Sequence, residues 1–155
     1  MTRISEPPRE PVKYVDATIH LPYHYVAGDH KARYLRALKE KKILGSRCSK
    51  TGKVFVPPLI VSPESFAPCE ELVEVADRGV VTAVARVHTP IAGLHPCTTP
   101  FAFVLVKLDG ADTAMAHVVR DGLDYLKVGS RVEAQWAPDE ERVGSIRDIA
   151  GFRVL

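Results

Sequence analysis

Two short segments decide how this chain folds: GSRCSKTGKVFVPP at residues 45–58 and SPES at residues 62–65. A zinc knuckle needs two thiolates three positions apart around a tight turn, and a second such pair completes a tetrahedral site. The positions that keep this spacing are Cys48, Thr51, Ser62 and Ser65. Because three of the four are hydroxyls, which are poor zinc ligands, the sequence predicts a ribbon frame that has lost its metal.

A ribbon without zinc must be held together by packing, because in metal-bound ribbons zinc supplies folding free energy of order 10 kcal/mol. Apolar side chains within and after the first segment can provide the necessary surface: Val54, Phe55, Val56, Leu59, Ile60, Val61 and Phe66. Cys48 is then expected to be a small buried hydrophobe. Residual metal binding through Cys48 and Cys69 is the alternative, although two thiols complete only half of a tetrahedral site.

After residue 70 the sequence alternates strand-like runs with turn residues such as Asp109-Gly110. The strands are expected at residues 71–75, 80–88, 101–108, 113–119, 131–136 and 146–154. Five or six short strands with one longer loop, residues 89–100, favour a small closed barrel of the OB type over a two-sheet sandwich. The predicted class is therefore mainly β.

The N-terminal part consists of two segments with different sequence patterns. Residues 1–27 contain several prolines and predict an extended arm, whose aromatics Tyr23 and Tyr25 are expected to anchor it on another surface. The run HKARYLRALKEKKIL then predicts a helix over residues 30–44, with Gly45 as its stop. The expected division is an arm at 1–27, a helix at 28–45, a degenerate zinc ribbon at 46–69 and a barrel at 70–155.

Composition narrows the function classes. The chain is 46% hydrophobic and 26% charged, has no apolar run that could span a membrane, and begins without the apolar core of a signal peptide, so a cytoplasmic protein without a membrane partner is expected. Three widely spaced cysteines predict free thiols in a reducing compartment. The net charge of +2, with both signs interspersed, gives no electrostatic signature of nucleic-acid binding.

The best candidate for catalysis is the loop that carries His88, His95 and Cys97. A Cys–His pair can act as nucleophile and base, yet no third residue that would orient the base is apparent. Together with His117 these side chains could also surround a metal, but none has ligand spacing on a regular element. Neither a phosphate-binding loop nor a dinucleotide fingerprint occurs. We expect no catalytic residue, and hydrolysis of an acyl-CoA through Cys97 is an alternative.

The order of these features resembles the DUF35 family, whose members are described as a rubredoxin-like zinc ribbon followed by an OB-fold. The family pattern runs from a helix through glycine, a basic residue, Cys-x-x-Cys-Gly, an apolar run, Pro-Pro and Cys-Pro-x-Cys into a strand and turn. The matching positions are Gly45, Arg47, Cys48, Thr51, Gly52, Val54 to Val56, Pro57, Pro58, Ser62, Pro63, Ser65, Leu72 to Asp77 and Gly79. The resemblance covers residues 21–155 and fails at three of the four cysteines.

The resemblance implies a role beside thiolase-like or lipid-transfer-type enzymes that handle acyl-CoA. The chain would be a non-catalytic accessory subunit in a hetero-oligomer of lipid metabolism, with no cofactor of its own and a CoA ester as a shared ligand. The side chains expected to meet the partner or the CoA phosphates are Tyr23, Tyr25, Arg33, Arg36, Lys39, Arg47 and Lys53. Single-stranded nucleic acid is the alternative ligand, disfavoured because the strands offer few aromatics for base stacking: Phe101, Phe103, Trp136 and Phe152.

Overall fold

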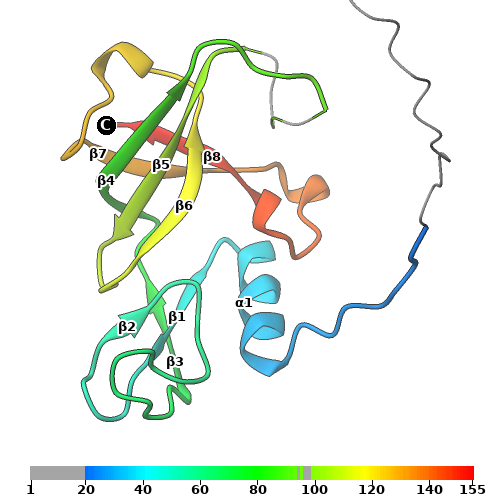
Figure 1. Ribbon diagram of the computed structural model, residues 1–155, viewed down its shortest axis with the longest axis vertical. Helices are drawn as coiled ribbons and strands as arrows, with labels where there is room; N and C mark the ends of the chain where they lie inside the picture. The colour runs from blue at the N-terminus through cyan, green and yellow to red at the C-terminus, as the bar shows by residue number, and fades with distance from the viewer. Residues whose placement is uncertain (1–19, 94, 96–98) are drawn as a thin grey trace, which may run out of the picture.

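A five-stranded barrel and a separate three-stranded sheet make up most of the described chain, which comprises residues 20–93, 95 and 99–155 of a computed structural model (Figure 1). The sheet has the order β2-β1-β3, with β1 at Ile43–Arg47, β2 at Val54–Phe55 and β3 at Glu71–Val75. We call residues 43–75 the small sheet. The barrel consists of β4 (Arg78–Val87), β5 (Phe101–Leu108), β6 (Ala114–Val119), β7 (Arg131–Trp136) and β8 (Ile149–Val154).

The barrel has the Greek-key order of an OB-fold, β4-β5-β6-β8-β7. All neighbouring strands are antiparallel except β6 and β8, which are parallel. A bulge between Val81 and Ala83 shifts the register of β4, which pairs with β7 at its start and with β5 along most of its length. The mainly β class and the OB-type barrel expected from the sequence are confirmed.

One hydrophobic core runs through the barrel, the helix and the small sheet. The inner face of β5 contributes Val104 and Val106, and β8 contributes Phe152. Leu38 of the helix and Ile43 of β1 belong to the same cluster, and both are fully buried. The small sheet is therefore packed against the barrel rather than tethered to it.

The helix α1 spans Asp29–Lys39 and ends five residues before the predicted end at Leu44. Lys41 has a positive φ of 60°, which turns the chain, and Ile43 then enters β1. Burial of Ile43 between sheet and barrel outweighs the helix propensity of this segment. Gly45 is not a helix stop but a strand residue, where a Cβ would lie 2.6 Å from a side-chain carbon of β2.

The remaining elements follow the predicted strands closely. The strands at 71–75, 101–108 and 131–136 have the expected bounds, and β3 pairs with β1 in the small sheet. The strand predicted from residue 146 begins only at Ile149, because a short 3-10 helix, η3 (Ile146–Asp148), precedes it. The other 3-10 helices are η1 (Leu123–Tyr125) and η2 (Asp139–Glu141).

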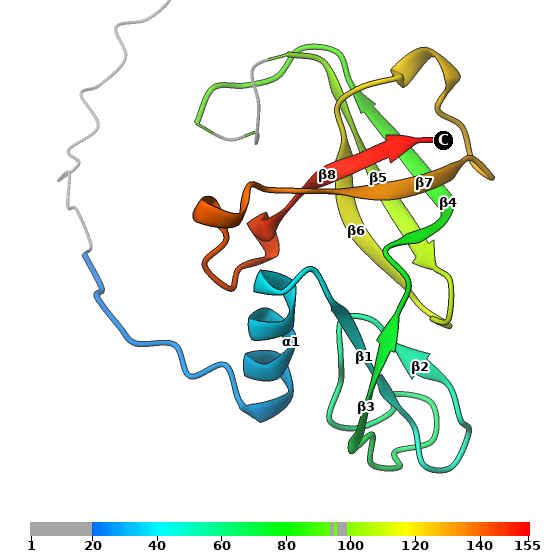
Figure 2. The ribbon, with the colours of Figure 1, turned by 180° about the vertical axis from the view of Figure 1, so that it is seen from behind.

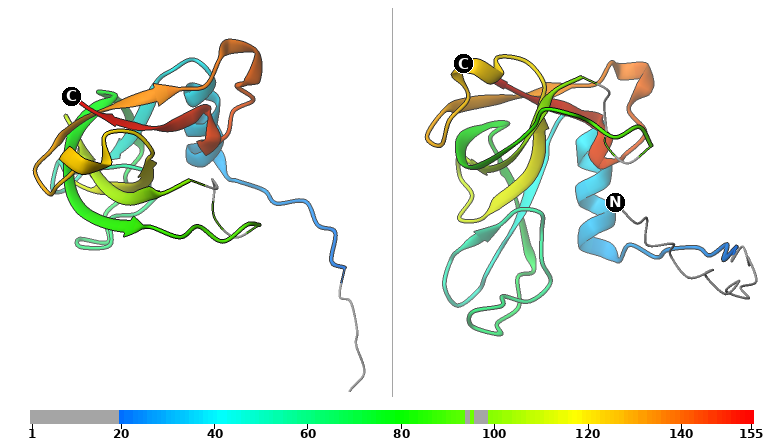
Figure 3. Two further views of the ribbon diagram at one scale, coloured as in Figure 1. Left: turned by 90° about the horizontal axis from the view of Figure 1, so that it is seen from above. Right: turned by 45° about the horizontal axis from the view of Figure 1, so that its top comes forward.

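The helix lies beside the small sheet and below the barrel, and residues 20–28 lead away from both (Figure 2). The view from above also shows residues 20–28 leading away from the helix and the barrel (Figure 3). Arg142, only 7% exposed, joins the helix to the barrel: its Nε donates to the carbonyl of Lys39 at 2.8 Å, and its Nη1 to that of Ala137 at 2.7 Å. No helix among the described residues is long and apolar enough to cross a membrane.

Candidate functional site

The two turns of the small sheet have the hydrogen bonding expected of a knuckle frame. In the first turn, the amide of Thr51 donates to Cys48 Sγ at 3.5 Å. In the second, the amides of Glu64 and Ser65 both donate to Ser62 Oγ at 3.3 Å. The two turns meet where Cys48 Sγ and Ser65 Oγ lie 3.3 Å apart. Each turn thus directs N–H groups at the side chain of its first position, where a metal-binding ribbon has a thiolate.

These side chains do not fit a tetrahedral zinc site. Ser62 is fully buried and its oxygen already accepts two amide hydrogens, while Thr51 Oγ1 accepts from the amide of Lys53 at 3.4 Å. Neutral hydroxyls supply no charge to balance Zn²⁺. Among the described residues, no three His, Cys, Asp or Glu side chains gather where an ion could be held.

We expect the purified protein to carry far less than one zinc ion per chain. The frame keeps its spacing, so a combined Thr51→Cys, Ser62→Cys and Ser65→Cys variant should raise the zinc content towards one per chain. Elemental analysis of both proteins, expressed with added zinc, measures this. One tightly bound zinc in the unmodified chain would contradict the prediction.

The thiol of Cys48 has an environment that stabilises its thiolate. The hydrogen bond with the Ser65 hydroxyl, followed by that with Thr51, lowers the pKa of Cys48 to about 6. Cys69 is fully buried and packs with Cys48 and Phe55 in a small cluster apart from the main core. Burial, followed by the charge of Cys48, raises the pKa of Cys69. Cys48 is buried as the sequence predicted, and its neighbours include polar groups of Ser65 and Thr51 as well as the apolar side chain of Phe55.

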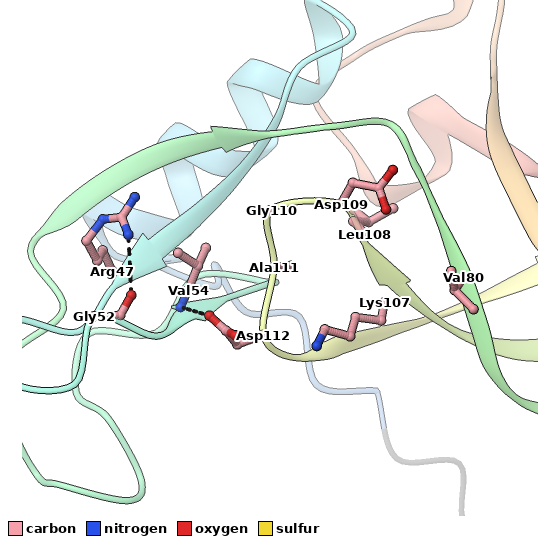
Figure 4. A pocket seen from close by; sticks show the side chains of 10 residues that line it. All are labelled: Arg47, Gly52, Val54, Val80, Lys107, Leu108, Asp109, Gly110, Ala111 and Asp112. Carbon is pink, nitrogen blue, oxygen red and sulfur yellow. Dashed lines mark hydrogen bonds between the residues drawn. The ribbon is translucent and has the colours of Figure 1, made fainter. Parts of the chain in front are cut away.

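A cleft of about 560 Å³ lies between the small sheet and the barrel (Figure 4). Its small-sheet wall consists of Arg47, Gly52 and Val54. Its barrel wall consists of Val80 from β4, Lys107 and Leu108 from β5, and the β5–β6 turn, residues 109–112. Asp112 joins the two walls, because its Oδ2 accepts the amide of Val54 at 2.9 Å.

The cleft is lined by two basic side chains, Arg47 and Lys107, which differ in whether an acidic side chain is paired with them. Arg47 forms an ion pair with Glu71 at 3.2 Å, whereas Lys107 is exposed and has no ion pair with any residue described in the structure. Asp109 is engaged by Arg131 through two hydrogen bonds of 2.8 and 2.6 Å, which hold the pKa of its carboxyl below the usual range. Lys107 is therefore the group most available to an anion, while the charge of Arg47 is shared with Glu71.

Only Arg47 of the seven side chains expected at a partner or CoA site lines this cleft. On α1, Arg33 forms an ion pair with Asp29 at 3.0 Å, and Arg36 and Lys39 are exposed. Lys53 is bound by both carboxylate oxygens of Glu64, at 2.8 and 2.6 Å. The sequence reasoning missed Lys107, although the Asp109-Gly110 turn beside it was a visible signal.

A second feature is an apolar surface formed by the arm and the loops of the small sheet. Its members, all at least 39% exposed, are Leu21, Tyr23, Tyr25, Val26, Leu59, Ile60, Val61 and Phe66. A hollow of about 280 Å³, lined by residues 27, 28, 30, 31 and 58–61, connects the arm to the loop. Phe66 is 83% exposed and has a positive φ of 54°, an uncommon conformation for a bulky residue. We call this set the apolar surface.

Two of the candidate histidines, His95 and His117, make separate local contacts. His95 Nδ1 accepts the amide of Ile91 at 2.8 Å, and its ring packs edge-on against Phe101 at 5.6 Å. The ring of His117 packs against Phe152 at 5.5 Å, and burial lowers its pKa. Cys97, like residues 1–19 of the arm, lies outside the described residues, so its suggested role in hydrolysis stays a prediction.

Comparison with known proteins agrees with this architecture. Residues 72–137 match the family model of the ChsH2 C-terminal OB-fold domain. The fold is similar to that of a protein of unknown function from the DUF35 family of Sulfolobus solfataricus, with a TM-score of 0.57 and 23% identity over 69% of this chain and 78% of that chain. It is also similar to the Ltp2-ChsH2(DUF35) aldolase, with a TM-score of 0.58 and 23% identity over 73% of this chain and 87% of that chain. No curated protein matches the sequence.

Proposed function

Since residues 72–137 match the family model of the ChsH2 C-terminal OB-fold domain and the chain has the fold of DUF35 proteins, we propose that this protein is a non-catalytic accessory subunit of a thiolase-like acyl-CoA enzyme. Among its structural neighbours is an aldolase assembly that includes a DUF35 protein.

The observation that carries the proposal is the apolar surface. Tyr23 is 81% exposed, Ile60 62% and Phe66 83%. Large apolar side chains that are exposed next to one another mark sites of protein association, and Leu59, Ile60 and Val61 line one hollow beside the arm. Aromatic side chains such as Tyr23 and Phe66 are also the residues that most often dominate interface energies. A protein partner is therefore the occupant that fits this surface best.

The cleft between the small sheet and the barrel supports the acyl-CoA part of the proposal. Arg47 and Lys107 present a guanidinium and an ammonium group on opposite walls. Both groups bind phosphate oxygens, Arg through its planar fork and Lys as a point charge. The cleft opens to solvent on the surface of this chain, so a CoA ester could lie partly here and partly in the partner enzyme.

The alternative of single-stranded nucleic acid has less support from the barrel. Of the four aromatics on the predicted strands, Phe101 and Phe152 are fully buried and Trp136 is half-buried. Only Phe103, 42% exposed, can offer a ring to a base. Binding of single strands relies on several stacked bases.

We expect a tagged chain, purified from its native cells, to retain a thiolase-like subunit. The variants Phe66→Asp and Ile60→Asp should each lower the recovered amount of that subunit at least about tenfold, because a buried unpaired carboxylate costs several kcal/mol at an interface. The matched controls are Tyr125→Asp and Val128→Asp, whose parent side chains are 79% and 63% exposed on the barrel. Quantitative mass spectrometry measures the recovery, and circular dichroism shows that each variant folds.

Two results would count against the proposal. Equal recovery of the thiolase-like subunit with all four variants would remove the apolar surface from the interface. Absence of such a subunit, together with acyl-CoA hydrolysis by the isolated chain that Cys97→Ala abolishes, would replace the accessory role by that of a hydrolase.

A further inference from the structure

The two described cysteines meet in the interior of the small sheet. Cys48 is 1% exposed and Cys69 is fully buried, and their side chains pack together in one small cluster. Their backbones also run side by side, since the amide of Ser49 donates to the carbonyl of Pro68 at 3.0 Å. Backbones joined by such a hydrogen bond lie roughly 5 Å apart, within the separation of Cα atoms that a disulfide bridges.

The two thiols differ in a way that suits oxidation to a disulfide. Ser65 Oγ lies 3.3 Å from Cys48 Sγ and the amide of Thr51 points at the same sulfur, so Cys48 is the thiolate of the pair. Cys69 is held by Phe55 and Ala67 in an apolar setting and stays protonated. One nucleophilic thiolate next to one thiol is the arrangement of a reactive and a resolving cysteine.

We propose that Cys48 and Cys69 form a redox staple, in which a hydroperoxide oxidises the pair to a disulfide at the place where a metal-binding ribbon has its ion. The Cys48 thiolate attacks one oxygen of the peroxide, the O–O bond breaks, and the departing oxygen takes a proton. Cys48 is then a sulfenic acid. The Cys69 sulfur attacks it, the S–O bond breaks, and the hydroxide leaves as water with the Cys69 proton. The two sulfurs lose two electrons, which the peroxide gains.

The staple closes a loop that includes part of the apolar surface. Residues 49–68 lie between the two cysteines, and they contain Ile60 and Phe66. The two turns around Cys48 and Ser62 are linked without a covalent bond, through the 3.3 Å contact of Cys48 with Ser65 and the ion pair of Lys53 with Glu64. A covalent link would reduce the freedom of this loop and fix the position of its exposed side chains.

The test treats the folded, full-length protein and its Cys97→Ser variant with hydrogen peroxide, then blocks free thiols and maps peptides without reduction. In both proteins we expect a peptide pair linked through Cys48 and Cys69, and a melting temperature raised by about 5–10 °C that falls back when dithiothreitol is added. Cys69→Ser should lose the linked pair and the temperature rise.

The proposal fails if both thiols remain free to alkylation after peroxide treatment and unfolding, or if the disulfides that form join Cys97 or two chains. If a serine variant does not fold, the peptide map of the unmodified protein still decides. A linked pair without any change in melting temperature would show that the disulfide forms but does not stabilise the folded protein, which also overturns the proposal.

Discussion

Replacing Gly79 by alanine is expected to lower the free energy of unfolding by about 3 kcal/mol or more, near the upper end of what overpacking costs. Gly79 lies on β4 where this strand is flanked on both sides, by Leu108 on β5 and by Val132 on β7. A Cβ at this position would lie 2.3 Å from the carbonyl oxygen of Lys107 and 2.8 Å from the Cα of Leu108. Both are backbone atoms of a paired strand, so neither can move aside without opening the barrel.

A second glycine provides the comparison for this variant. Gly151 on β8 also has no positive φ, and a Cβ there would lie 3.2 Å from the carbonyl of Val118. The clash is milder, so Gly151→Ala should cost about 1 kcal/mol. Urea unfolding followed by circular dichroism measures both. Equal urea midpoints of unfolding for Gly79→Ala and the unmodified protein would mean that β4 does not pair with β5 and β7 in this way at Gly79.

Replacing Asp148 by alanine is expected to cost about 2–4 kcal/mol. Its carboxylate is 1% exposed and accepts three backbone hydrogen bonds, from Val143 at 3.2 Å, Gly144 at 2.8 Å and Ser145 at 3.1 Å. Alanine would leave these amides without acceptors. The loop that they stabilise packs against α1, since a Cβ on Gly144 would lie 3.3 Å from the carbonyl of Leu35.

Two further variants separate the causes of this loss. Asp148→Asn keeps one acceptor oxygen and should cost less than alanine, while Asp121→Ala removes an exposed carboxylate and should be nearly neutral. Thermal unfolding ranks the three. An Asp148→Ala protein as stable as Asp121→Ala would show that solvent replaces the carboxylate and that the loop does not depend on it.

The sequence predicted the barrel well because turn residues separate the strands and because a strand such as β5 alternates inward and outward side chains over most of its length. In β5, for example, Val104 and Val106 are buried while Leu105 and Lys107 face outward. The helix end was wrong because local propensity favours helix through residues 40–44, whereas pairing of Ile43 with Val75 of β3 decides the outcome. Such pairing joins residues far apart in the chain and is invisible to local patterns.

The candidate site was predictable only in part, for the same reason. The turn at Cys48 could be located because its residues are close together in the sequence, and in the structure the amide of Thr51 donates to Cys48 Sγ. The cleft could not, because Arg47 and Lys107 are sixty positions apart and come together only when the small sheet packs on the barrel. The contact of Cys48 with Cys69 likewise depends on how the loop between them folds back.

The continuous core also bears on how the small sheet keeps its order with hydroxyl side chains at three of the four predicted ligand positions. In a ribbon that folds around an ion, each lost ligand removes folding free energy from a self-contained unit. Here Leu38, Ile43 and Val54 are buried in one cluster with the barrel residues Val106 and Phe152, so the barrel contributes to the order of the small sheet. Serine and threonine can then replace cysteine without unfolding the region. The evolutionary histories of the two parts become linked, because a mutation that loosens the barrel also loosens the small sheet.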